Sequence, residues 1–152
     1  MKPNELARKH LERKLAPLRQ MELAPPSRGW LRAIREALGM TSVQLGARLR
    51  VVPSRITALE KAEVSGGTTI KSMREAAEAM GCTFVYAIVP ARPLDEIMHA
   101  RATALADAEI ARVHHTMRLE EQALDPRDLA DARARAIAAY LHGNPRRLWD
   151  AP

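Results

Sequence analysis

A run of polar and basic side chains between residues 53 and 61 could hydrogen-bond to the edges of nucleic-acid bases. Pro53 is typical of a first helical position, and a helix over Pro53–Lys61 would bury Ile56 and Leu59. The exposed side of that helix would then present Ser54, Arg55, Thr57, Ala58 and Lys61. Such a row of side chains suits base edges in the DNA major groove.

Arg55 is the best candidate for reading sequence, because a guanidinium group can hold two acceptors of one guanine. Ser54 can donate or accept a hydrogen bond, and Ala58 offers a methyl contact to thymine. The alternative for Arg55 is a phosphate contact, which would position the protein without reading sequence.

A second short helix, Ser42–Leu49, is predicted just before this one, with Leu45 and Leu49 on its apolar face. Only residues 50–52 separate the two helices, a spacing typical of a helix-turn-helix. Thr41 is the predicted N-cap. The N-terminus of the first helix would lie against DNA phosphate and would present Thr41, Ser42 and Gln44; for Gln44 simple solvation is the alternative.

Two flanking helices complete the predicted domain. The upstream helix, Trp30–Leu38, stops at Gly39, and the downstream helix, Ile70–Met80, is capped by Thr69 and stops at Gly81. We expect them to contribute to one apolar core the side chains of Trp30, Ile34, Ala37, Leu38, Ile70, Met73, Ala77 and Met80.

The stretch LGMTSVQLGARLRVVPSRITALEKAE resembles the lambda-repressor-like (Cro/C1, XRE) DNA-binding family. Arg50 stands where that family usually has a turn glycine, and Val52 replaces the usual capping Ser or Thr; both changes weaken local stability by up to about 1 kcal/mol. The resemblance also implies a structural ion pair between Arg35 and Glu60.

The charge of the chain is unevenly distributed. Its 152 residues carry a formal net charge of +6, but residues 1–61 hold 13 Lys/Arg against 5 Asp/Glu, and residues 62–152 hold 11 against 13. The basic half contains the predicted helix-turn-helix, as expected of a protein that binds the phosphate backbone.

The sequence predicts neither an enzyme nor a metal or cofactor site. The five histidines are scattered, and the motifs H-E-x-x-H, phosphate loop and nucleophile elbow are missing. Cys82 is the single cysteine, so no internal disulfide is possible, and we expect a buried or strand-edge thiol. No apolar run of eighteen residues and no signal-peptide pattern occurs, which predicts a cytoplasmic protein without a membrane partner.

Outside this domain, the N-terminal stretch Lys2–Leu23 has the leucine spacing of one helix, broken or bent near Pro17. It could pack on its own core, contact a second copy or flank the DNA.

Residues 82–89, CTFVYAIV, are the only β-rich run. A lone strand would pair with the same strand of a second copy, and a homodimer is what reading two half-sites requires.

Two further helices are predicted over Leu94–Ala123 and Arg127–Leu141, followed by a tail in which we expect Trp149 to be docked.

Nearly the whole chain resembles the mobile mystery protein A family. The resemblance is carried by the segments RKLAPLRQ, PPSRGWLRAIREALGMT, GCTFVYAIVP, HTMRLEEQAL and RRLW. That family is similar to helix-turn-helix antitoxins and occurs beside a partner with a Fic domain. Fic domains typically transfer AMP from ATP to proteins. The resemblance implies an antitoxin that represses its own operon.

Fic inhibitors of this type carry a helix with the pattern S/T-x-x-x-E-G/N, whose Glu obstructs productive ATP binding in the Fic site. HTMRLEEQ resembles it through Thr116 and Glu120, although Glu121 replaces the Gly or Asn and a solvated helix is the alternative. If Thr116 and Glu120 belong to a helix, they share one face of it.

We therefore predict a mainly α protein with a lambda-repressor-like helix-turn-helix domain, an N-terminal helix, one short dimerising β-strand and C-terminal helices. The predicted divisions are an N-terminal helix and linker, 1–28; the DNA-binding domain, 29–81; the strand, 82–90; and a partner-binding helical region, 91–152. The expected partners are operator double-stranded DNA, a Fic-domain toxin and a second copy of the chain. The alternative is a simple dimeric transcriptional regulator with no toxin partner.

Overall fold

The computed structural model describes residues 3–119 and 125–150, and this part of the chain is mainly helical, as predicted. The chain folds as two compact units. One unit is Met21–Ile88; the other joins Met1–Gln20 to Val89–Pro152. No helix among the described residues is both long and apolar enough to cross a membrane.

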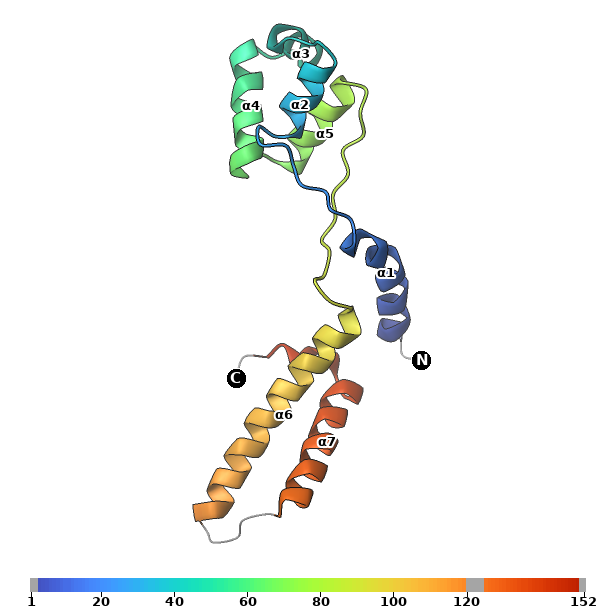
Figure 1. The fold of residues 1–152 in the computed structure, drawn as a ribbon, viewed down its shortest axis with the longest axis vertical. Helices are drawn as coiled ribbons and strands as arrows, with labels where there is room; N and C mark the ends of the chain where they lie inside the picture. The colour runs from blue at the N-terminus through green and yellow to red at the C-terminus, as the bar shows by residue number, and fades with distance from the viewer. Residues whose placement is uncertain (1–2, 120–124, 151–152) are drawn as a thin grey trace. The chain divides into compact units, whose positions relative to one another are not determined.

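The unit Met21–Ile88 is a cluster of four helices (Figure 1): α2 (Trp30–Ala37), α3 (Ser42–Leu49), α4 (Pro53–Ser65) and α5 (Ile70–Ala79). The predicted starts of all four are confirmed, and α4 runs four residues past its predicted end. Gly66 caps its C-terminus, where a φ of 78° puts the backbone in the left-handed region that glycine tolerates. Thr69 caps α5 as predicted, its side chain accepting a hydrogen bond from the Ser72 amide at 3.0 Å.

The core of this unit is small and draws on every helix. Its buried members are Leu31, Leu45, Ile56, Met73, Ala76 and Met80. Cys82, expected to be buried or at a strand edge, is partly buried against this core, and its Sγ lies 3.7 Å from the Met80 carbonyl.

The predicted inward face of α2 is only partly confirmed: Ile34 packs against the core, but the other three predicted residues, Trp30, Ala37 and Leu38, are exposed. Leu31 is buried instead. The helix is turned so that Arg35, one helical turn after Leu31, also points inward. Because the charged Arg35 lies on the buried side, that side does not stand out as apolar in the sequence. Helical periodicity therefore assigns other apolar residues of α2 to the core. Ile70, at the start of α5, is also more exposed than predicted.

The predicted β-strand is not seen, which corrects the fold prediction. Residues 82–90 belong to no helix or strand, and within the described part of the chain no backbone hydrogen bond ties residues 83–89 to another segment. The physical reason is that a strand exists only when a second strand supplies the ladder, and this chain has no second β-rich run. Val85, Tyr86 and Ile88 are therefore exposed along this segment.

The other unit contains α1 (Pro3–Arg19), α6 (Leu94–Leu119), α7 (Pro126–His142) and the 3₁₀ turn η1 (Pro145–Leu148). The helices α6 and α7 run side by side as a hairpin (Figure 1). Polar contacts tie the hairpin together: Tyr140 donates to Glu109 at 2.9 Å, and Arg133 pairs with Asp107. The helix α1 continues through Pro17 and ends earlier than predicted, at Arg19.

The apolar core of this second unit is thin. Among the described residues its buried hydrophobic side chains are Ala102, Ala106 and Leu148. The expectation that Trp149 is docked is wrong, because its side chain is 58% exposed while the neighbouring Leu148 is fully buried. Arg101 fixes this end of the chain by donating to the Leu148 carbonyl at 2.7 Å.

Candidate DNA-binding surface

Helix α4 has one buried side and one exposed side, and the exposed side carries the predicted base-reading residues. Ile56 and Glu60, one turn apart, are buried at 1% and 6% exposure. The opposite side presents, all exposed, Ser54, Arg55, Thr57, Ala58 and Lys61. No hydrogen bond or ion pair of these five side chains occurs within the described residues. Their donors and acceptors are therefore free for an external partner.

The orientation of α4 is fixed by a buried ion pair with α2. Arg35 and Glu60 form two hydrogen bonds, of which Nη2 to Oε2 measures 3.1 Å, and Arg35 also donates to the Met40 carbonyl at 2.9 Å. The hydrogen bond to Glu60 raises the pKa of Arg35 further above its ordinary value, so the guanidinium stays charged. Pairing with Glu60 allows the charged Arg35 to lie inside the unit. Because Glu60 must face Arg35, the pair also sets which side of α4 points toward α2.

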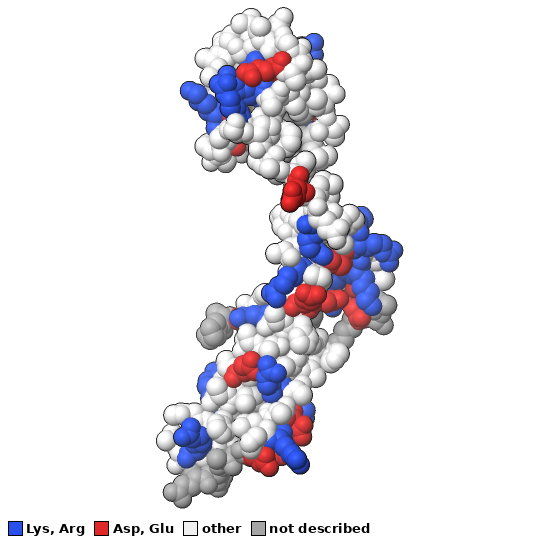
Figure 2. All heavy atoms as spheres, viewed as in Figure 1, with Lys and Arg blue, Asp and Glu red and all other residues white. Residues whose placement is uncertain are grey.

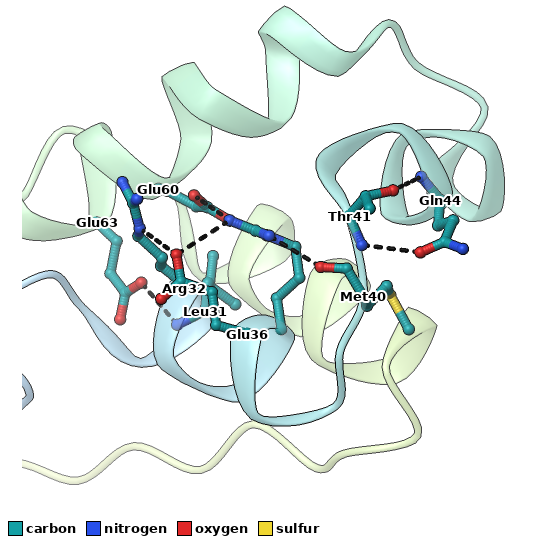
Figure 3. Close-up of polar contacts among 9 residues, drawn as sticks. Leu31, Arg32, Glu36, Met40, Thr41, Gln44, Glu60 and Glu63 are labelled. Atoms are coloured by element: carbon teal, nitrogen blue, oxygen red, sulfur yellow. Dashed lines mark hydrogen bonds and ion pairs between the residues drawn. The ribbon is translucent and has the colours of Figure 1, made fainter.

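A second carboxylate of α4 holds the start of α2. Glu63 accepts a hydrogen bond from the backbone amide of Trp30 at 2.7 Å. It also accepts one from the amide of Leu31 at 3.0 Å (Figure 3). It replaces an N-cap that α2 lacks, since Gly29 has no side chain to supply one. Sequence reasoning misses Glu63, because its partners lie more than 30 positions earlier and no local pattern marks them.

The three-residue turn between α3 and α4 brings the two helices together, and it is tight. Arg50 adopts a φ of 58° and is the single non-glycine residue with positive φ in the described chain. Gly46, buried on α3, allows the turn to approach closely, since a Cβ there would lie 2.7 Å from the Val51 carbonyl oxygen. The first departure from the family pattern, Arg50 in place of glycine, is thus accommodated in the left-handed region.

The N-terminus of α3 is locked by the predicted cap. Thr41 Oγ1 accepts from the Gln44 amide at 3.1 Å, and Gln44 Oε1 accepts from the Thr41 amide at 2.8 Å (Figure 3). Both oxygens are engaged, but the Thr41 hydroxyl hydrogen and the Gln44 side-chain NH₂ remain as donors toward an anion. Ser42 is only half-buried and lies beside them in the first turn.

The start of α4 offers a further donor. Val52 occupies the N-cap and supplies no side-chain hydrogen bond, so the Ser54 amide is left without a capping side chain. Amides at a helix start are suited to donate to phosphate oxygens.

The basic charge is shared between the two units. Residues 21–88 carry nine Lys/Arg and six Asp/Glu, a net of +3, whereas residues 1–20 carry six and two, a net of +4. Half of the excess of +8 in residues 1–61 therefore belongs to residues 1–20, which lie in the other unit. The remaining residues, 89–152, have nine basic and ten acidic side chains, a net of −1.

The second predicted site lies at the end of α6. Thr116 is exposed there, and its hydroxyl donates to the Arg112 carbonyl at 3.1 Å. Glu120, the residue predicted to inhibit a Fic partner, lies outside the described residues, as does Glu121. No group of three or more His, Cys, Asp or Glu side chains in the described ranges could hold a metal ion.

Comparison with known proteins gave no relative: no family model, curated protein or solved structure matches this chain.

Proposed function

We propose that this chain is a helix-turn-helix DNA-binding protein of the lambda-repressor-like type, in which α4 reads base edges in the major groove. The observation that carries the proposal is the exposed row on α4. Its side chains form no hydrogen bond or ion pair within the described residues, while the opposite side of the same helix is held by Ile56 and Glu60. A recognition helix must be packed rigidly against its own domain on one side and must present unpaired hydrogen-bonding groups on the other.

In this proposal each predicted residue has a part. Arg55 reads a guanine, Ser54 and Ala58 contact neighbouring bases, and Thr57 and Lys61 lie toward the flanking backbone. The α3 N-terminus holds a phosphate through Thr41, Ser42 and Gln44. The protein binds and performs no catalytic step.

Binding as a homodimer completes the proposal, because two half-sites need two recognition helices. The segment 82–90 supports it: the peptide groups of residues 83–89 lack backbone partners in the described chain, and Val85 and Ile88 are 78% and 89% exposed. Two copies of this segment related by a two-fold axis would satisfy each other's backbone and cover these side chains.

A DNA-binding titration tests the role of Arg55. The DNA immediately upstream of the coding region is titrated with native chain and with Arg55→Ala, in the presence of competitor DNA. We expect the variant to lose about 1–3 kcal/mol, or about 5- to 150-fold, on the upstream DNA and to relax its preference at one base position. The matched control is Arg74→Ala, which removes an exposed arginine of α5 from the same unit.

Equal loss by Arg55→Ala on every DNA sequence would reduce Arg55 to a phosphate contact. Binding of the native chain that competitor DNA removes completely would contradict the proposed sequence-specific function itself.

We further propose that the protein is an antitoxin that represses its own operon and neutralises a Fic-domain toxin. The support is the resemblance of nearly the whole chain to the mobile mystery protein A family, together with Thr116 and Glu120 at the spacing of an inhibitory helix. A simple dimeric regulator without a toxin partner is the alternative. Co-purification with a Fic-domain protein encoded beside it separates the two.

The inhibitory role is tested by Glu120→Ala, with Glu121→Ala as the matched control. Transfer of AMP by the neighbouring Fic protein is measured with each variant present. We expect Glu120→Ala to release that activity while upstream-DNA binding stays at the native level. Full inhibition by this variant would show that Glu120 is not the obstructing residue.

A further inference from the structure

Helix α1 has two unlike faces. Residues Arg8, Glu12 and Arg19 lie on one face and are partly buried against the start of α6. Arg8 Nε lies 2.8 Å from Asp95 Oδ1, Glu12 accepts from the Leu94 amide at 3.1 Å, and Arg19 donates to the Pro90 carbonyl at 2.9 Å. Arg19 also pairs with Glu12 and thereby lowers the pKa of that carboxyl. This face is fully occupied within the unit.

The opposite face of α1 is basic and unoccupied. His10, Arg13 and Lys14 stand at i, i+3 and i+4, so they share one side of the helix, and all three are exposed. No ion pair or hydrogen bond of these three side chains occurs in the described chain, whereas the adjacent Lys9 lies 3.5 Å from Glu5. Lys and Arg side chains gather over α1 in Figure 2.

We infer that this outer face of α1, built on Arg13 and Lys14, is a second DNA-binding surface that contacts phosphates of the duplex. The inference rests on the DNA-binding function proposed above and extends it beyond the helix-turn-helix unit. Residues 1–20 carry a net charge of +4, and the whole unit Met21–Ile88 carries +3, so this short N-terminal stretch supplies at least as much attraction for a polyanion as the helix-turn-helix unit.

The composition of α1 favours a nucleic acid over a lipid surface. A helix that lies in a membrane interface needs a continuous apolar face opposite its basic one. In α1 that opposite face carries Arg8, Glu12 and Arg19, all engaged in polar contacts, with the partly buried Leu15 between them, so it is not a continuous apolar face. Of the exposed leucines, Leu6 lies within the basic face, one turn before His10, and Leu11 lies about 140° away around the helix, so the two form no continuous apolar face.

The expected contribution of this surface is affinity without sequence preference. Arg13 and Lys14 are long side chains without a rigid second contact, which suits phosphate oxygens better than base edges. Each phosphate contact releases counterions, so two contacts should steepen the dependence of log K on log salt concentration by about 0.9 each.

The test compares salt titrations of DNA binding. Native chain, Arg13→Gln/Lys14→Gln and a control, Arg127→Gln/Arg135→Gln, are titrated by fluorescence anisotropy against the upstream DNA and against an unrelated duplex. The control removes two exposed arginines of α7 from the same unit. Glutamine keeps the helix propensity and much of the length of the side chain, and circular dichroism verifies that each variant folds.

We expect the α1 variant to lower the salt slope by about 1.8 on both duplexes. The ratio of the two affinities should stay the same, and the control should keep the native slope. An unchanged slope in the α1 variant would overturn the inference, as would an equal loss in the control, since that would reflect net charge alone. Preferential binding of the native α1 face to anionic vesicles, with the DNA slope unchanged in the variant, would likewise assign it to a membrane instead.

Failure of this inference is separate from failure of the proposed function. Sequence-specific reading is measured by the affinity ratio and by Arg55→Ala, whereas the α1 contact is measured by the salt slope on either duplex. A chain that shows no preference for the upstream DNA would still report whether α1 contacts phosphate.

Discussion

Arg50 lies in the turn between α3 and α4, and its backbone conformation is strained for a non-glycine residue. Its φ of 58° lies in the left-handed region, where the Cβ of an L-residue crowds the backbone and glycine is favoured. Its backbone amide, in turn, donates to the Ala47 carbonyl at 3.3 Å and ends α3. The conformation is therefore required by the turn and not by the arginine side chain, which is exposed.

We predict that Arg50→Gly stabilises the unit Met21–Ile88 by about 0.5–1 kcal/mol, because glycine adopts this conformation without strain. Urea unfolding monitored by circular dichroism measures the change. The control is Arg50→Ala, which removes the same charge but keeps a Cβ at positive φ. If alanine stabilises as much as glycine, the gain comes from charge and not from the backbone.

The pair Arg35 and Glu60 explains the main error of sequence reasoning at this scale. The resemblance to a known family implies the pair, and the structure confirms it with both side chains buried. The periodicity of α2, however, when interpreted from apolar residues alone, places Trp30 inward instead of Leu31. A charged residue whose partner lies 25 positions away cannot be assigned to a core from local spacing.

At the scale of elements, the contact between α3 and the recognition turn depends on Gly46. This residue is buried within a helix, where glycine is ordinarily unfavourable by about 1 kcal/mol relative to alanine. The helix tolerates it because the turn passes so close that a Cβ would meet the Val51 carbonyl oxygen at 2.7 Å. The neighbour is backbone and cannot swing away.

We predict that Gly46→Ala destabilises the unit by about 1–2 kcal/mol, since overpacking of the turn exceeds the gain in helix propensity. It should also weaken binding to the upstream DNA, because the turn sets the position of α4. Thermal unfolding and the DNA titration measure the two effects. Gly67→Ala is the control, since the nearest neighbour of its new Cβ would be Ser65 Oγ at 3.4 Å. A Gly46→Ala variant as stable as native would contradict this account.

The helices themselves are largely predictable, because each carries local signals. The Thr41 cap, Pro53 at the first position of α4, and the glycines after α2 and α5 mark helix ends that the structure places within a residue or two. The strand predicted at 82–90 is wrong, because pairing is a non-local property and this chain offers no partner run. The exposed row on α4 can be predicted from the inward positions of Ile56 and Leu59. The hydrogen bonds by which Glu63 holds the start of α2 cannot, because they join residues far apart in the sequence.

At the scale of the whole molecule, the two units differ in how their cores are built. The unit Met21–Ile88 buries side chains from all four of its helices, whereas the unit with α6 and α7 buries two alanines and Leu148 among its described residues. Burial of so little apolar surface yields little stability on its own, at about 25 cal/mol per Å². The polar ties between α6 and α7 add to it, but exposed ion pairs contribute only about 0–1 kcal/mol each.

We propose that two copies of the chain assemble through residues 82–90. In an extended segment the N–H groups of neighbouring residues point in opposite directions, so alternate residues donate to a paired strand. Ala87→Pro and Ile88→Pro each remove one N–H, and one of the two must therefore belong to the ladder. Both residues are exposed and lie outside every helix, so we expect the substitutions to leave the fold of each unit intact.

We expect the native chain to sediment as a dimer and one of the two proline variants to sediment as a monomer at the same concentration. Ala87→Ser and Ile88→Thr are the controls, because they keep the N–H while changing the side chain. The monomeric variant should also bind a single half-site no more weakly than native while losing affinity for the complete upstream site. Dimers of equal stability in both proline variants would place the interface elsewhere, and the thinly packed α6 and α7 hairpin would then be the next surface to test.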